Sequence, residues 1–121
     1  MALNDITVTV SAIPYVFKVN EVDASRVLRL DTTNGSLSLP FALTHSQQKG
    51  SATKPDRHLI RVDIAKQNPT SGLISTVSAH TVLTVPRAPA IAGTDLQLAY
   101  EILRTYLTPA QALAISKGLL P

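Results

Sequence analysis

The stretch from residue 57 to residue 66 alternates between apolar and charged side chains, and this alternation constrains the fold more than any other feature of the chain. On an extended strand the two sets point to opposite sides. The apolar set is Ile60, Val62 and Ile64, and the charged set is Arg57, Arg61 and Asp63. One side therefore needs a core and the other needs water or a charged partner, which is typical of an antiparallel sheet that is covered on one face only.

Length and composition indicate a single folded domain over residues 1–121, with strands in about 1–87 and helices in about 94–118. Hydrophobic residues make up 45% of the chain and charged residues 16%, a globular balance. No stretch approaches the roughly 20 apolar residues of a membrane span, and residues 1–5 do not resemble the start of a secretory signal. Because the chain has no cysteine, disulfides and thiolate metal sites are excluded.

Basic residues are concentrated in the middle of the chain. Residues 49–66 contain five basic side chains and two acidic ones, whereas the rest of the chain taken together contains six of each. A solvated strand surface and a binding surface for an anionic partner, nucleic acid first, both fit this pattern.

Alternating segments dominate the first two thirds of the sequence. Residues 6–10 and 15–19 are typical of a β-hairpin, and Pro40 indicates an edge position or a bulge within the fourth strand. The remaining expected strands are 25–30, 36–46, 57–66 and 73–85.

Two helices are expected after the strands. Thr94 and Gln97 have the spacing of a capping box, Thr108 followed by Pro109 predicts the start of a second helix, and Gly118 stands where that helix would end. The order predicts an α+β domain with an N-terminal β-hairpin, an antiparallel sheet and two C-terminal α-helices packed on one face.

The helices are short compared with the sheet. A helix of about 13 residues spans only about 20 Å, so apolar area would stay exposed from Leu98, Ile102, Leu113, Ile115, Leu119 and Leu120. We therefore expect an intertwined homodimer with a continuous sheet and exchanged helices. Its interface residues are expected to be Leu96, Tyr100, Leu103, Leu107 and Leu113. The alternative is a monomer whose hairpin folds over the apolar surface.

Catalysis and metal binding are weakly supported by the sequence. Asp63, Ser78 and His80 are the residue types of a hydrolase triad, but no nucleophile elbow or Gly-rich phosphate loop accompanies them. His45 and His58 have the parity of the apolar side, so the three histidines are not expected to converge on a metal. Asp63 on the charged side can instead pair with Arg61 or with a residue across the strands. We expect neither an enzyme nor a small-molecule substrate.

Several short segments, in this order, resemble the coat proteins of single-stranded RNA bacteriophages of the levivirus type. The segments are Met1-Ala2-Leu3, Asn34-Gly35, residues 57–64, residues 67–70 and Leu83-Thr84-Val85-Pro86. The resemblance covers essentially the whole chain.

This resemblance implies a structural protein whose dimers assemble into an icosahedral shell around RNA, in a virion assembled in the bacterial cytoplasm. The implied RNA-facing residues on the strands are Arg61, Thr44, Ser46, Ser78 and His80, and the basic segment adds Arg57 and Lys49. The turn of Asn68, Pro69, Thr70, Ser71 and Gly72 is the implied contact between dimers and is shorter than in many relatives. No cofactor is implied, although structural calcium is compatible with the family.

Ser78 stands where some members of that family place a tyrosine that stacks on an RNA base. Because sequence-specific RNA recognition depends on such stacking, we expect RNA packaging here to be driven mainly by charge. The alternative function is a cellular dimeric nucleic-acid-binding domain that does not form shells.

Overall fold

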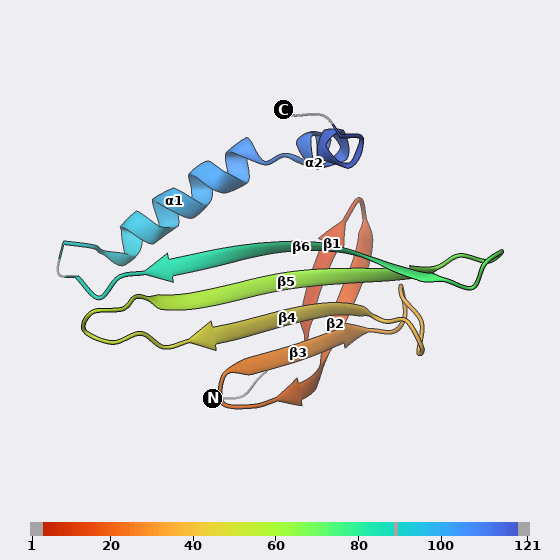
Figure 1. Ribbon diagram of the computed structural model, residues 1–121, viewed down its shortest axis with the longest axis horizontal. Helices are drawn as coiled ribbons and strands as arrows, with labels where there is room; N and C mark the ends of the chain where they lie inside the picture. The colour runs from red at the N-terminus through yellow and green to blue at the C-terminus, as the bar shows by residue number, and fades with distance from the viewer. Residues whose placement is uncertain (1–3, 89, 119–121) are drawn as a thin grey trace.

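A six-stranded antiparallel meander followed by two helices makes up the chain in the computed structural model, which describes residues 4–88 and 90–118 (Figure 1). The expected α+β fold with an N-terminal hairpin is confirmed. The expectations for Met1 to Leu3, Leu119 and Leu120 fall outside the described residues. The elements are β1 (Ile6–Val10), β2 (Ile13–Val22), β3 (Arg26–Asp31), β4 (Phe41–Gln48), β5 (Asp56–Gln67), β6 (Ile74–Val85), α1 (Gly93–Tyr106) and α2 (Pro109–Ser116).

The longest pairing joins β5 to β6 over twelve residues, from Asp56 opposite Val85 to Gln67 opposite Ile74. Asn68 closes the turn between them, because its side-chain oxygen accepts a hydrogen bond from the Thr70 amide at 2.8 Å while its own amide donates to the Leu73 carbonyl. Strand β6 is the last in the sheet order, so one side of its backbone lies at the sheet edge.

The β1–β2 hairpin folds over the apolar face of the sheet. In Figure 1 it runs steeply across the nearly horizontal strands β3 to β6. Its two-residue turn has positive φ at Ser11 and Ala12, the geometry that matches strand twist in a tight hairpin. Tyr15 stacks on Phe41 with ring centroids 6.2 Å apart. Phe17 and Phe41 are the buried apolar residues of the described chain.

The prediction that the fourth strand begins at residue 36 is wrong, because β4 begins at Phe41. Residues 36–39 form a turn in which the Ser36 amide donates to the Leu39 carbonyl and the Leu39 amide donates to the Ser36 hydroxyl. Pro40, which has no amide hydrogen, precedes the strand. The alternation of serine and leucine over residues 36–39 has the period of a strand, although the backbone forms a turn there.

The second helix starts as expected and the first does not. Thr108 caps α2 by accepting a hydrogen bond from the Gln111 amide, and Gly118 follows the helix with φ of 79°. For α1, Thr94 lies inside the helix, and the Ala92 amide donates instead to the Asp95 carboxylate at 2.9 Å. The Thr94 and Gln97 spacing gave no sign of this contact, because the carboxylate belongs to Asp95 inside the helix and not to a residue before it.

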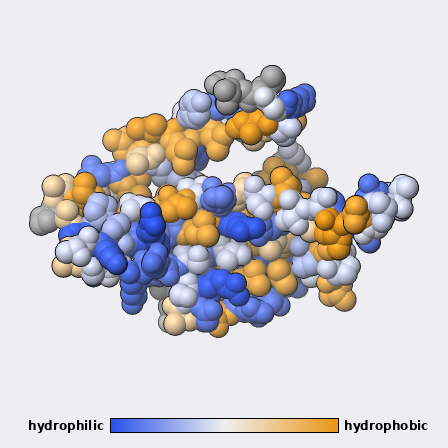
Figure 2. Space-filling model, viewed as in Figure 1, coloured by the Kyte–Doolittle hydropathy of each residue, from blue (hydrophilic) through white to orange (hydrophobic). Residues whose placement is uncertain are grey.

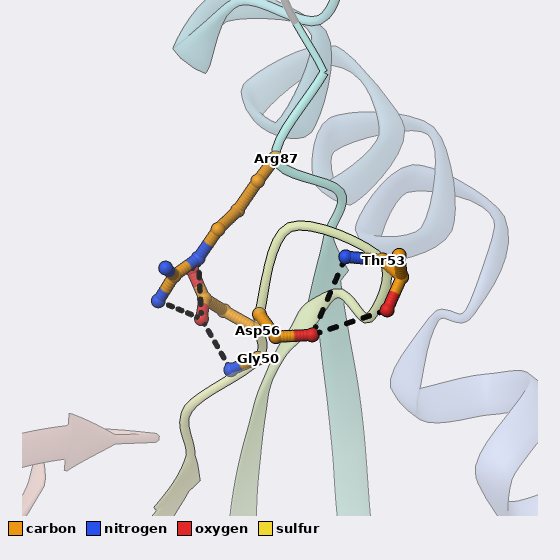
Figure 3. Close-up of polar contacts among 5 residues, drawn as sticks. Gly50, Thr53, Asp56 and Arg87 are labelled. Atoms are coloured by element: carbon orange, nitrogen blue, oxygen red, sulfur yellow. Dashed lines mark hydrogen bonds and ion pairs between the residues drawn. The ribbon is translucent and has the colours of Figure 1, made fainter.

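An ion pair fastens the β4–β5 loop to the segment that leads into α1 (Figure 3). The Asp56 carboxylate accepts hydrogen bonds from Arg87 Nη2 at 3.0 Å and from the Gly50 amide at 2.7 Å. These hydrogen bonds lower the pKa of Asp56, and the bond from Arg87 has the largest effect. A Cβ at position 50 would lie 2.1 Å from the Lys54 carbonyl oxygen, so glycine is required there. The contact fixes the point where the chain leaves the sheet.

Much apolar surface remains uncovered in the single chain. Its accessible area is 9210 Å², whereas a compact monomer of 12.9 kDa exposes about 6,300 Å². Neither helix has a buried residue among those described, and Figure 2 shows hydrophobic residues gathered along the helical layer. If two subunits each covered this excess of about 2,900 Å², they would bury about 5,800 Å² in total, at the upper end of obligate interfaces.

Replacing Asp31 by alanine should destabilise the fold by about 3 kcal/mol at pH 7. The buried Asp31 carboxylate accepts hydrogen bonds from the Thr33 amide, the Asn34 amide and the Asn34 side chain, at 2.8 to 2.9 Å. Urea unfolding followed by circular dichroism at a fixed protein concentration measures the loss.

The pH dependence of the same variant provides a second check. Burial by itself raises the pKa of Asp31, but the hydrogen bonds from Asn34, Thr33 and Val16 outweigh it and lower the pKa. Because its pKa is lower in the folded protein, ionised Asp31 stabilises the fold at pH values above its unfolded pKa of about 3.9. This stabilisation is lost as the pH falls through the pKa of the folded state. Asp31→Asn, which keeps one acceptor, should lose less than Asp31→Ala. If the wild type, Asp31→Ala and Asp31→Asn were equally stable, the Asp31 hydrogen bonds would not stabilise the fold.

Candidate nucleic-acid interface

The sheet face opposite the hairpin carries most of the residues expected to contact RNA. The pairing registers place Thr44, Arg61 and His80 in one row across β4, β5 and β6. A neighbouring row contains Ser46, Leu59 and Val82, and others contain Asp63 with Ser78 and Arg57 with Thr84. We call these ten residues the open face. Lys49 lies beyond them in the loop after β4, and the role of every one of these residues in RNA binding stays a prediction.

Arg61 is held by two neighbours on the open face. Its Nε donates to Asp63 Oδ1 at 2.7 Å and its Nη2 donates to the Ser78 hydroxyl at 3.3 Å. The Ser78 hydroxyl donates in turn to Asp63. The side chain of Arg61 is 47% exposed and that of Asp63 is 23% exposed, so the guanidinium remains open to a partner while its direction is set.

Asp63 is ionised in this arrangement. Burial alone raises the pKa of Asp63, but the hydrogen bonds from Ser78 and Arg61 and the charge of Arg61 outweigh it, and the pKa is lowered. The face is therefore less basic than its arginines suggest. The expectation that Asp63 can pair with Arg61 is confirmed.

The same contacts argue against a hydrolytic triad. In such a triad the histidine lies between the serine and the carboxylate, whereas here Ser78 donates directly to Asp63. His80 lies opposite Arg61. The serine is thus bound to an acceptor that orients it, not to a base that would withdraw its proton.

A shallow hollow of about 350 Å³ lies on the open face beside Arg57. Leu59 and Val82 form its apolar lining, and its polar lining residues are Ser46, Gln47, Gln48 and Arg57. The sequence did not mark Leu59 as a site residue because it is uncharged, although its odd position puts it on the same side of β5 as Arg57 and Arg61. A planar apolar group could lie on Leu59 and Val82 within reach of the Arg57 guanidinium.

The two other histidines lie on the apolar side of the sheet, as their parity indicated. His45 Nε2 and His58 Nδ1 are 3.0 Å apart. Within residues 4–88 and 90–118, no group of three or more histidine or carboxylate side chains is placed to hold a metal ion.

The residues expected at the dimer interface line the helices without being buried in the single chain. Tyr100, Leu103, Leu107 and Leu113 are 43 to 58% exposed, and Leu96 is half-buried. The turn from Asn68 to Gly72 is exposed throughout. No helix in the part of the chain that the structure describes has the length and apolar character of a membrane span.

Solved structures of viral particles share this fold. The whole chain superposes on a subunit of the virus-like particle of bacteriophage AVE019 with a TM-score of 0.80, 14% identity and 99% of that chain covered. For the virus-like particle of Beihai levi-like virus 21 the TM-score is 0.76 and the identity 11%, with 100% of this chain and 98% of that chain covered.

The coat protein of bacteriophage EMS014 matches over 85% of this chain and 72% of that chain, with a TM-score of 0.67 and 14% identity. No protein-family model matches the sequence, and a search of curated proteins finds no match. The fold implied by the levivirus resemblance is thereby confirmed.

His45 should make the stability of the protein sensitive to mild acid. Loss of hydration, the neighbouring His58 and the charge of Arg29 lower the pKa of His45. Because the unfolded chain then binds a proton more readily than the folded one, stability is retained above the unfolded pKa of about 6.5 and falls as the pH drops below it. The thermal midpoint should fall between pH 7.5 and pH 5, and fall less in His45→Gln. His80→Gln, on the open face, controls for the loss of an imidazole.

Proposed function

We propose that this chain is the capsid protein of an RNA bacteriophage, whose dimers assemble into an icosahedral shell around single-stranded RNA. The observation that carries the proposal is the match of essentially the entire chain to subunits of virus-like particles. The role is structural and not enzymatic, and its place is the virion, assembled in the cytoplasm of a bacterial host.

The proposed dimer uses the surfaces that the single chain leaves open. Strand β6 pairs with β6 of a second copy, which removes two exposed sheet edges. The helices of each copy lie on the apolar sheet face of the other, beside the hairpin. A hollow of about 450 Å³ there is lined by Val8, Val10, Tyr15, Phe17, Phe41, Leu43, Val62, Ile64 and Lys66. The excess surface of the single chain supports this arrangement because a dimer of this kind would cover it.

The proposed RNA surface is the open face. Arg61 and Arg57 contact phosphates, and the polar side chains of Thr44, Ser46 and Ser78 supply hydrogen bonds. Phosphate contacts position RNA without reading its sequence. The described open face has no Phe, Tyr or Trp ring for stacking, so charge supplies most of the affinity. Leu59 and Val82 offer a place for one base in the hollow beside Arg57.

A cellular dimeric nucleic-acid-binding domain is the second candidate. It would share the basic face and the dimer but would remain a small oligomer. Particle formation separates the two candidates.

Expression of the chain alone in bacteria should yield large particles that contain RNA. On a sizing column they should elute far ahead of a dimer, absorb as nucleic acid and appear as shells in the electron microscope. Nuclease treatment of intact particles should leave the enclosed RNA in place. A small dimer without RNA under all assembly conditions would reject the capsid proposal.

Arg61→Glu should weaken the binding of the dimer to RNA about tenfold, and the slope of affinity against salt should become shallower by about one. Asp63→Asn should strengthen binding, because it removes the charge that Arg61 now faces. Filter binding between 50 and 300 mM salt measures both. Lys117→Glu makes the same charge change at the end of α2 and serves as the control. If Arg61→Glu and Lys117→Glu weakened binding equally, the open face would not be the RNA surface.

A further inference from the structure

Leu37 has the most exposed large apolar side chain in the described chain, at 91%. It lies in the loop between β3 and β4. Tight turns usually carry Gly, Asn, Asp, Ser or Pro, so a fully hydrated leucine at such a place contributes nothing to the stability of the single chain.

The start of the loop that carries Leu37 is held by hydrogen bonds to two strands. The buried Asp31 carboxylate binds the amides of Thr33 and Asn34 at its start. The Asn34 side chain also donates to the Pro14 carbonyl of the hairpin at 3.0 Å. These bonds anchor the loop to both β2 and β3.

The turn around Leu37 is closed by its neighbours. Ser36 and Leu39 exchange hydrogen bonds through the Ser36 amide, the Leu39 carbonyl, the Leu39 amide and the Ser36 hydroxyl, so Leu37 and Ser38 form the tip. A Cβ at Gly35 would lie 2.7 Å from the Phe41 amide nitrogen, which means the backbone packs too closely there for any other residue. Leu37 is therefore presented to solvent by an ordered turn.

Leu37 lies outside the open face and away from the β6 edge. In an antiparallel meander, alternate loops lie at the same end of the sheet, so the β3–β4 loop shares its end with the β5–β6 turn. Leu73, next to that turn, is 70% exposed. The β6 edge that is proposed to form the dimer is two strands away from β4, and the open face is formed by strand residues and not by this loop.

We propose that Leu37 is an apolar contact between dimers, which inserts into a neighbouring copy of this chain in the assembled shell. This inference rests on the proposed function. A closed shell needs contacts between dimers besides the dimer interface. The turn from Asn68 to Gly72 is one expected contact, and Leu37, at the same end of the sheet, would add an apolar one. A single leucine surrounded by the polar Thr32, Thr33, Ser36 and Ser38 fits a small contact repeated many times better than it fits a large interface with a different protein.

The expected size of the effect follows from hydrophobic burial. Covering one leucine side chain strengthens an association by about tenfold to a hundredfold. Because the contact would recur on many copies, its loss should act strongly on shell assembly and hardly at all on the isolated dimer.

The test compares Leu37→Asn with Leu37→Met, and with Ser38→Asn as a control in the same turn. The wild-type chain and the three variants are expressed alone, and dimers obtained by dissociating the particles are reassembled over a range of concentrations. Leu37→Asn should keep the circular dichroism, the dimer size and the RNA affinity of the wild type. The concentration that it needs for shell assembly should rise at least tenfold, whereas Leu37→Met and Ser38→Asn should assemble like the wild type.

Two results would overturn the inference while leaving the proposed function intact. Assembly of Leu37→Asn at the wild-type concentration would show that Leu37 is not buried in the shell. Loss of the dimer in Leu37→Asn, with Leu37→Met unaffected, would place Leu37 in the dimer interface. A wild-type chain that forms only small dimers would reject both proposals together.

Discussion

The apolar face of the sheet is the constraint on which the structure depends. The period of two in β5 puts Ile60, Val62 and Ile64 on that face and the charged residues on the other. The hairpin covers only part of the apolar face, since stacking of Tyr15 on Phe41 protects one region of it. Among residues 4–88 and 90–118 no helix residue is buried, and the apolar residues of α1 and α2 remain exposed. The sheet and the helices therefore both leave apolar surface exposed, and each could cover that of the other.

On the open face, the carboxylate of Asp63 lies among the residues proposed to bind an anion. Asp63 reduces the net charge, but it also fixes the direction of Arg61 and, through Ser78, ties β5 to β6. An arginine oriented in advance loses less conformational freedom on binding than a free one. Within the proposed function, Asp63 weakens the electrostatic attraction of the open face for RNA but keeps Arg61 in one orientation.

The sequence predicted the strands, the helices and the two faces of the sheet, but it did not predict where β4 and α1 begin. Alternation placed Thr44, Arg61 and His80 on one face because each strand keeps its period over its whole length. It failed at residues 36–40, where Leu37 and Leu39 alternate with serines inside a turn closed by hydrogen bonds that parity cannot reveal. It also failed at the start of α1, where the hydrogen-bonded carboxylate comes from Asp95 inside the helix and not from a hydroxyl before it. The pairing of Arg61 with Asp63 was foreseen only as one option, because two residues on the same side of a strand can each turn to other neighbours.

The separation of the helices from the sheet has a consequence for folding. Helices of this length are marginal in water without tertiary packing, and α1 and α2 bury no described residue in the single chain. The Asp56–Arg87 pair fixes only where the chain leaves the sheet. The helices therefore depend for most of their stability on a surface supplied from outside the chain, and if that surface is a second copy, folding of the helices and association are one step. Within the proposed function, an assembly surface completed only by dimerisation would keep single chains from joining a growing shell.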